Sequence, residues 1–243
     1  MTTVFGPARV LVAVPVFNEE RTVASVVAAV RTHAPRFDLV MINDGSSDAT
    51  EAILRDLKVT TATHLCNLGY GRAIQTAIRY ARANQYDALI TLDADGQHRP
   101  EDVERLYADF EAGGVDILIG SRFVEHRRYE NTPLLRRLGM RLFSAVVGTL
   151  TGQAIYDTSS GLKIVHRRVF DLLAERPFVD FHAEVLTYVI ASGHRVAESP
   201  IAVNERHHGS SMYSWFSAIE YLPKVAFLTL MGFVEARLMK GKP

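Results

Sequence analysis

Two aspartates, Asp93 and Asp95, stand one residue apart at the end of the strand-like run 87–93. On an extended backbone, residues two apart point to the same side, so their carboxylates repel each other unless a cation lies between them. Ligands that are all oxygens suit Mg²⁺ or Mn²⁺, and Gln97 or His98 is placed to complete such a shell. An acidic turn is the competing interpretation of this spacing, and the surrounding sequence has to decide between the two.

Similar polar clusters follow three other apolar runs. Their sequences are PVFNE at 15–19, NDGSSD at 43–48 and GSR at 120–122. In an open parallel sheet, the carboxyl ends of the strands form the ligand-binding crevice. Four clusters at strand ends are hard to attribute to turn chemistry alone, so a cation becomes the leading interpretation of the two aspartates.

The elements that must position these clusters alternate between strand and helix in the first half of the chain. Apolar, β-branched runs predict strands buried on both faces, at 9–16, 39–43, 87–93 and 115–120. Apolar residues three and four apart predict helices between them, at 19–34, from Asp48, at 71–83 and from Pro100 to Gly113. This alternation predicts an α/β fold with a mainly parallel sheet flanked by helices.

The second half of the chain has a different pattern. Helices are predicted at about 133–151, at 182–192 and at roughly 214–240, where Pro223 is expected to introduce a kink. The expected organisation is a single domain in which a helix-rich half wraps around a ligand-binding sheet half.

Composition excludes several classes of protein. The chain has 243 residues, 48% of them hydrophobic, and its 27 basic and 27 acidic residues cancel. Zero net charge argues against general nucleic-acid binding, and the single cysteine, Cys66, can form no internal disulfide, which fits a reducing compartment. Neither a signal-peptide pattern nor a run of about 20 apolar residues is present. The glycine-rich fingerprints of dinucleotide and Walker phosphate binding are also missing.

Basic and apolar residues adjoin each other in two segments of the second half. Residues 127–141 hold five arginines, including Arg136 and Arg137, and the apolar run 142–152 follows them; the C-terminal segment 213–243 repeats the combination. Such segments are typical of a surface that lies on a membrane and gathers anionic lipid. A solvated helix face, a dimer interface or a packed core are the alternatives.

In their order along the chain, these motifs resemble the family 2 glycosyltransferases with the GT-A fold. The four clusters are joined by NLGYGRA at 67–73, DTSSGLK at 157–163, FHAEVL at 181–186 and ERHHGSSMYSW at 205–215. The order is similar to that of dolichyl-phosphate and polyprenyl-phosphate sugar transferases. It implies a Rossmann-like sheet with a nucleotide-sugar-binding half at 1–122, an acceptor half at 123–212 and C-terminal amphipathic helices at 213–243.

The resemblance implies roles for individual residues. The donor-binding residues would be those that follow the strands, namely Pro15, Phe17, Glu19, Asp44, Gly69, Asp93, Ala94 and Asp95. The ligands of Mg²⁺ or Mn²⁺ on the donor diphosphate would be Asp93, Asp95 and Gln97. On the acceptor and phosphate side, the residues would be Arg122, Arg136, Arg137, Arg206 and Ser210. The residues that act in the transfer itself would be Asp95, Arg122, Glu184 and Arg206.

Two of these positions depart from the family pattern. Family members often carry two aspartates after the second strand, where this chain has Asn43 and Asp44. Many members that attack with a hydroxyl carry a Glu-Asp pair in the acceptor half, whereas here Glu184 is followed by Val185. A lipid phosphate is already an anion and needs no general base, so this departure favours a phosphate acceptor. For Glu184, a base, a salt-bridge partner and a buried structural acid all remain open.

The resulting hypothesis is metal-dependent, inverting transfer of a hexose from GDP-mannose or a UDP-hexose to polyprenyl or dolichyl phosphate. The enzyme is expected in the cytoplasm, peripheral at the cytoplasmic face of a membrane. A membrane-protein partner or a homodimer is a further expectation. One alternative is a GT-A enzyme that acts on a saccharide or small-molecule hydroxyl. The other is a non-catalytic, membrane-associated protein that binds nucleotide sugars.

Overall fold

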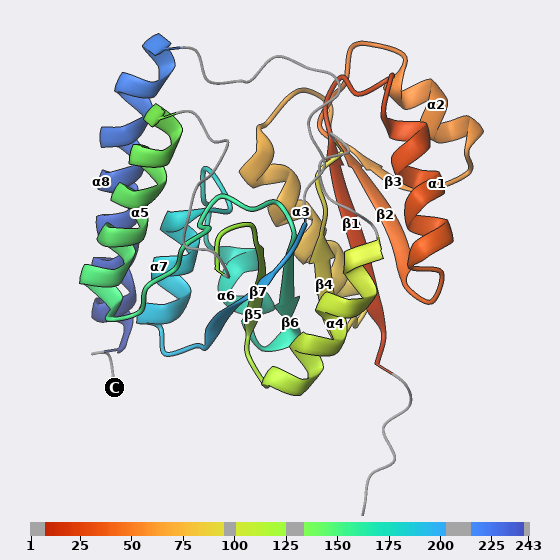
Figure 1. Ribbon diagram of the computed structural model, residues 1–243. Helices are drawn as coiled ribbons and strands as arrows, with labels where there is room; N and C mark the ends of the chain where they lie inside the picture. Colours follow the sequence, from red (N-terminus) through yellow and green to blue (C-terminus); the bar gives the residue numbers. More distant parts are fainter. Residues whose placement is uncertain (1–7, 95–100, 125–133, 203–214, 241–243) are drawn as a thin grey trace, which may run out of the picture.

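The computed structural model describes residues 8–94, 101–124, 134–202 and 215–240, with the backbone alone at 134–136, 215–222 and 240. Within these residues, the centre is a seven-stranded sheet with the strand order β3-β2-β1-β4-β6-β5-β7 (Figure 1). Its strands are β1 Val10–Val16, β2 Asp38–Asn43, β3 Thr60–Thr63, β4 Ala88–Thr91, β5 Ile117–Ser121, β6 Lys163–His166 and β7 Val196–Pro200.

The sheet is parallel except for one strand. β1 pairs in parallel with β2 and β4, β2 with β3, and β5 with β7, whereas β6 runs antiparallel to both β4 and β5. The carboxyl ends of the six parallel strands therefore meet at one edge. The helices that flank the sheet are α1 Val23–His33, α2 Thr50–Asp56, α3 Tyr70–Ala83, α4 Glu101–Gly113, α5 Leu134–Thr151, α6 Phe170–Glu175, α7 Ala183–Ala191 and α8 Trp215–Lys240.

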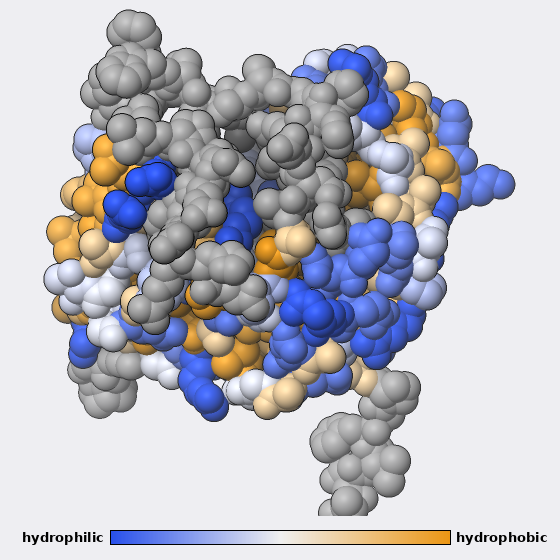
Figure 2. All heavy atoms as spheres, in the orientation of Figure 1, coloured by the Kyte–Doolittle hydropathy of each residue, from blue (hydrophilic) through white to orange (hydrophobic). Residues whose placement is uncertain are grey.

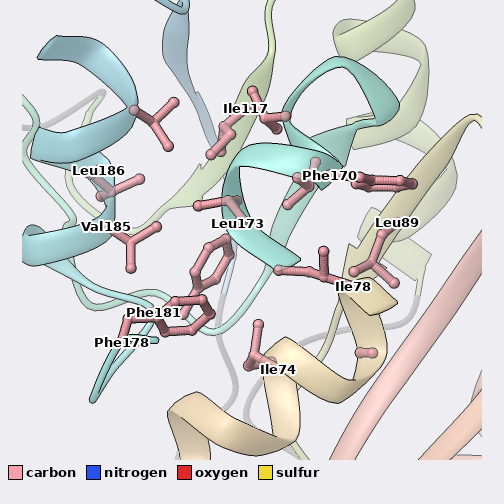
Figure 3. Close-up of a cluster of buried hydrophobic side chains, with 14 of the residues drawn as sticks. Ile74, Ile78, Leu89, Ile117, Phe170, Leu173, Phe178, Phe181, Val185 and Leu186 are labelled. Atoms are coloured by element: carbon pink, nitrogen blue, oxygen red, sulfur yellow. The ribbon is translucent and has the colours of Figure 1, made fainter. Parts of the chain in front are cut away.

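Alternating side chains of the strands build two apolar layers. In β1, Leu11 and Ala13 pack on one side of the sheet, while Val12 and Val14 pack on the other. Helices α3, α6 and α7 close the first layer, part of which Figure 3 shows, and α1, α2 and α4 close the second. The ligand edge of the sheet is thus held between two fully packed cores.

The C-terminal helix packs along α7 and α5 at the outside of the domain (Figure 1). Gly232 permits close contact, because a Cβ there would lie 3.3 Å from the carbonyl oxygen of Glu184. The helix spans Trp215–Lys240 as one element, with Pro223 inside it. Among the described residues, every helix is too short or too polar to cross a bilayer.

The α/β architecture and every element predicted from periodicity are confirmed, to within a few residues. The second half is helix-rich as expected, and it also contributes two strands that were not predicted, β6 and β7, to the same sheet, with β6 between β4 and β5. Four elements, β3, β6, α6 and β7, were not predicted. They are short, and three of them, TTAT, KIVH and VAESP, have polar or charged residues within or at their ends.

Candidate active site

The predicted donor residues lie at the common carboxyl edge of the sheet. Hydrogen bonds tie the loop after β1 to the loop after β2. Asn18, with a positive φ of 56°, accepts a bond from the Ser47 amide at 2.8 Å, and the Glu19 amide donates to Thr50 Oγ1 at 2.9 Å. Pro15 is half-buried, and Phe17 remains 44% exposed beside these fixed loops. An exposed aromatic ring on rigid backbone is suited to hold a planar base.

Asp44 is buried and supports the turn that begins α3. Its carboxylate accepts bonds from the amides of Leu68 at 2.9 Å and Gly69 at 2.8 Å, and one oxygen lies 2.7 Å from Nδ1 of His64. Gly69 has a φ of 93°, a conformation that favours glycine. The predicted contact between Asp44 and a base stays untested; the observed role is to fix the NLGYGRA turn.

Asn43 carries a buried donor for which the described residues supply no acceptor. Its Oδ1 accepts a bond from the Ser46 amide at 3.0 Å, but Nδ2 has no hydrogen-bond partner in this part of the structure. A buried donor without a partner costs free energy that a ligand can recover. The amide therefore suits a position at which a polar ligand atom binds.

Asp93 packs its carboxylate against the backbone of Gly161. A Cβ added at Gly161 would overlap the Asp93 carboxylate, and Tyr70 Oη donates a bond to Asp93 Oδ1 at 3.3 Å. Backbone contact on one side and a hydroxyl on the other fix the carboxylate at the end of β4. A fixed carboxylate is the type of oxygen ligand that Mg²⁺ and Mn²⁺ accept, so Asp93 fits the predicted metal site.

The predicted metal shell includes two further residues. Asp95 and Gln97 lie outside the described residues, and within those residues no three acidic, histidine or cysteine side chains come together. Ala94 is buried in the apolar layer beneath α4, so its side chain serves packing.

Arg122 has a buried carboxylate as its partner. Its Nε and Nη2 donate to the two oxygens of Asp157, both at 2.7 Å, and Nη2 also donates to Ser159 Oγ at 3.0 Å. Burial alone would raise the pKa of Asp157, but the charge and hydrogen bonds of Arg122 hold that pKa below its ordinary value. A phosphate bound at Arg122, as predicted, would therefore share the guanidinium with Asp157, which already binds it through two hydrogen bonds.

Lys163 is a site residue that sequence reasoning missed. Its side chain is fully buried, Nζ donates to the Ser160 carbonyl, and the ammonium lies 5.2 Å from the centroid of the Phe181 ring. Burial lowers the pKa of Lys163 to about 8, against the opposing charges of Asp157 and Asp93. The available signal was a lysine inside the otherwise apolar run GLKIV at 161–165.

His182 was missed in the same way. Its ring centroid is 5.7 Å from that of Tyr70, and its buried Nδ1 makes no hydrogen bond to any residue that the structure describes. Burial and the charge of Lys163 lower the pKa of His182 to about 4, so the imidazole is neutral at pH 7. A neutral ring next to Tyr70 can bind a hydroxyl without adding charge to the site.

Glu184 forms a salt bridge, one of the three roles open to it. Arg176 donates from Nη1 to Glu184 at 2.9 Å and from Nε to Glu235 of α8 at 2.7 Å. Burial raises the pKa of Glu184, although Arg176 opposes the shift. The bridge joins α7 to α8 through one guanidinium, and this geometry favours a structural role over a catalytic base.

The acceptor-side prediction can be assessed at one arginine. Arg137 is half-buried, and its Nε is a buried donor without a partner in the described part of the chain. It lies one helical turn before Met140, which packs against Phe123 and Tyr156. By helical spacing, Arg137 therefore stands on the side of α5 that packs against Phe123 and Tyr156, the sequence neighbours of Arg122 and Asp157. The side chain of Arg136, and all of Arg206 and Ser210, lie outside the description.

Comparison with known sequences agrees with this geometry. A sequence profile described as "Glycosyl transferase family 2" matches residues 11–173. The polyprenol monophosphomannose synthase of Mycolicibacterium smegmatis is 29% identical, over 96% of this chain and 91% of that protein. An uncharacterized protein of Methanocaldococcus jannaschii is 30% identical over 79% and 80%, and the undecaprenyl-phosphate mannosyltransferase of Micrococcus luteus is 28% identical over 85% and 88%.

Solved structures resemble the chain in fold. Glucosyl-3-phosphoglycerate synthase from Mycobacterium tuberculosis, solved with Mn²⁺, UDP-glucose and phosphoglyceric acid, superimposes with a TM-score of 0.65 at 18% identity. The match covers 95% of this chain and 80% of that protein. At this identity, the likeness supports a shared GT-A architecture and carries no statement about substrates.

Proposed function

The chain belongs to glycosyl transferase family 2, and from this premise we propose that it transfers a hexose, with inversion, from a nucleotide sugar to polyprenyl phosphate. The observation that carries the donor half is the Asp93 carboxylate, fixed against Gly161 at the carboxyl end of β4. The acceptor half is carried by relatives named for transfer to polyprenyl phosphates, which align over most of the chain.

On the donor side, Phe17 and Pro15 would face the base, and Asn43 Nδ2 would donate to it. Asp93, with Asp95 and Gln97, would hold Mg²⁺ or Mn²⁺ on the diphosphate. When bound, the cation supplies a Lewis acid that stabilises the leaving nucleoside diphosphate. A structural neighbour with the same fold was solved with Mn²⁺ and UDP-glucose, which motivates the choice of cation and donor to test.

On the acceptor side, a phosphate oxygen of the lipid would attack the anomeric carbon while the bond from that carbon to the diphosphate breaks. The products are a polyprenyl-phosphate hexose and a nucleoside diphosphate. The attacking oxygen is already an anion, so no base has to remove a proton, which agrees with the engagement of Glu184 by Arg176. The unpartnered Nε of Arg137 supports a role in holding the acceptor phosphate, together with Arg136, Arg206 and Ser210.

Transfer to lipid is the direct test of this proposal. Purified protein with Mn²⁺ and radiolabelled GDP-mannose or a UDP-hexose is expected to move label into the organic phase only when polyprenyl phosphate is present. Phosphoglyceric acid and free saccharides serve as alternative acceptors in parallel reactions. Label in the aqueous product with one of these acceptors, and none in the lipid, would favour the small-molecule alternative. Binding of a donor without transfer to any acceptor would favour the non-catalytic alternative.

An apolar flank formed by α5 and α8 supports a membrane location for the acceptor (Figure 2). The flank consists of exposed apolar side chains, namely Leu138, Leu142, Phe227, Leu230, Met231, Val234, Leu238 and Met239. Exposed basic residues, Arg141, Lys224 and Arg237, lie on the same two helices. Apolar and basic residues together fit an anionic bilayer surface, so peripheral attachment through this flank is part of the proposal.

Polar substitutions on the flank are expected to weaken membrane binding. The double variant Phe227→Ser/Leu238→Ser should bind liposomes with anionic lipid at least about tenfold more weakly, because each buried CH₂ contributes roughly 0.8 kcal/mol and the two substitutions remove several such groups. Co-sedimentation with liposomes measures the change. The matched control is Leu65→Ser/Val179→Ser, which alters side chains of 105% and 45% exposure outside the flank and should leave binding unchanged. Equal binding by both double variants would contradict attachment through the flank.

A further inference from the structure

Lys163 is a buried cation placed next to the proposed metal ligand. In the β4–β6 pair it stands opposite Thr91, two residues before Asp93. Thr91 Oγ1 donates to the Gly161 carbonyl at 2.7 Å and accepts from the Lys163 amide at 3.2 Å. The same hydroxyl therefore fixes the backbone on which the Asp93 carboxylate rests and the backbone that carries the lysine.

The ammonium group of Lys163 is enclosed by the protein. Nζ donates to the Ser160 carbonyl and faces the Phe181 ring, and the side chain has no exposed surface. Ser160 directly precedes Gly161, so the ammonium group of Lys163 binds the same turn against which the Asp93 carboxylate packs. A fully buried lysine is costly unless carboxylates offset its charge.

Three carboxylates favour the charged lysine, Asp157 most strongly, then Asp93 and then Asp180. Asp157 already forms a bidentate pair with Arg122, with both contacts at 2.7 Å. Asp157 is thus already paired with Arg122, and Lys163 adds a further buried positive charge that acts on Asp93. Any divalent ion at Asp93 has to bind against this fixed positive charge.

We propose that Lys163 is a positioning residue that makes divalent-cation binding at Asp93 depend on a bound nucleoside diphosphate. Without nucleotide, the ammonium opposes a second cation at the same carboxylate. A diphosphate brings at least two negative charges and removes the electrostatic penalty. The cation and the nucleotide then bind together, and a metal without donor is disfavoured. This inference rests on the proposed function, since it requires that Asp93 binds the metal.

A purely structural lysine would behave differently. If Lys163 served only to hold the turn 160–163, its removal would loosen the backbone against which Asp93 packs and weaken Mn²⁺ binding with and without nucleotide. If its charge governs metal binding, its removal strengthens Mn²⁺ binding in the nucleotide-free protein. The two roles therefore predict changes of opposite sign in the same measurement.

Titration with Mn²⁺, followed by the electron paramagnetic resonance signal of the free ion, tests the inference. Lys163→Gln, which can still donate to the Ser160 carbonyl, is expected to bind Mn²⁺ about tenfold more tightly than wild type without nucleotide. The stimulation of Mn²⁺ binding by UDP or GDP should fall by a similar factor. Lys163→Arg keeps the charge and should retain the stimulation seen in wild type, and Lys163→Met is the second neutral variant if the glutamine variant does not fold.

Each outcome of the titration separates the inference from the proposed function. Wild type that binds Mn²⁺ with UDP or GDP, together with unchanged or weaker nucleotide-free binding in the folded neutral variants, would overturn the role of Lys163 alone. Wild type that binds no Mn²⁺ even with either nucleotide would overturn both the metal assignment and this inference.

Discussion

Replacement of Asp93 by asparagine is expected to reduce sugar transfer about 10³-fold in kcat/KM, measured with Mn²⁺ at saturating acceptor. Asparagine has nearly the same shape, so it keeps its place against Gly161 and can still accept the bond from Tyr70. What it removes is the negative charge that holds the cation on the donor diphosphate. The residual activity of the variant should therefore be insensitive to a chelator that abolishes wild-type activity.

The matched control lies at the other end of the same strand. Asp87 precedes β4 and pairs with Arg167 at 2.9 Å, at the edge of the sheet opposite Asp93. Asp87→Asn should change kcat/KM by less than about threefold, since exposed ion pairs contribute little. If Asp93→Asn retained activity within tenfold of wild type, the assignment of Asp93 as a metal ligand would be wrong.

The gathering of polar clusters at the carboxyl edge of the sheet could be predicted, because it follows from the local sequence of each strand. A run such as VLVAVPV has one stable arrangement, buried on both faces, and parallel pairing then brings every following polar cluster to one edge. The polar clusters that contain Phe17, Asp44 and Asp93 were located from this placement, and the family resemblance then implied the roles of the individual residues. Periodicity failed where the pattern is weak, as in β3 and β7, whose strand pairing is decided by the rest of the sheet.

The partners of the charged residues could not be predicted because they are distant in sequence. Arg122 and Asp157 are 35 positions apart, and neither the GSR motif nor the DTSSGLK motif indicates that the arginine binds the aspartate. Arg176 likewise joins Glu184 to Glu235, a residue 59 positions away. Sequence resemblance assigned Arg122 to phosphates, whereas its position in the fold gives it a buried carboxylate first.

These pairings place buried charges next to the carboxyl edge of the sheet, where the donor is proposed to bind. Arg122 and Lys163 supply two cations, Asp157 balances one of them, and the amides of Tyr156 and Asp157 are in turn held by Glu198, both at 2.8 Å. Glu198 therefore anchors the loop on which Asp157 lies, and Asp157 orients Arg122. The stability of the site depends on this chain of contacts more than on the exposed ion pairs of the surface.

Asp157→Asn is accordingly expected to lower the free energy of unfolding by about 3 kcal/mol at pH 7, because it leaves the charge of Arg122 without its buried partner. Chemical denaturation in urea, followed by circular dichroism, measures the difference. The matched control is Asp171→Asn, an aspartate whose side chain is 90% exposed and pairs with Arg82, and a change within about 0.5 kcal/mol is expected there.

The pH dependence of this difference identifies its cause. In the native protein, Arg122 holds the pKa of Asp157 below its ordinary value, so the unfolded chain takes up the proton first as the pH falls. The contribution of the ion pair is therefore fully present above about pH 4 and is lost as the pH falls through the native pKa. The stability gap between wild type and Asp157→Asn should be constant from pH 5 to 7 and should narrow below pH 4. A gap that stays the same at pH 3 would mean that the variant loses packing or hydrogen bonds rather than the charge of the pair.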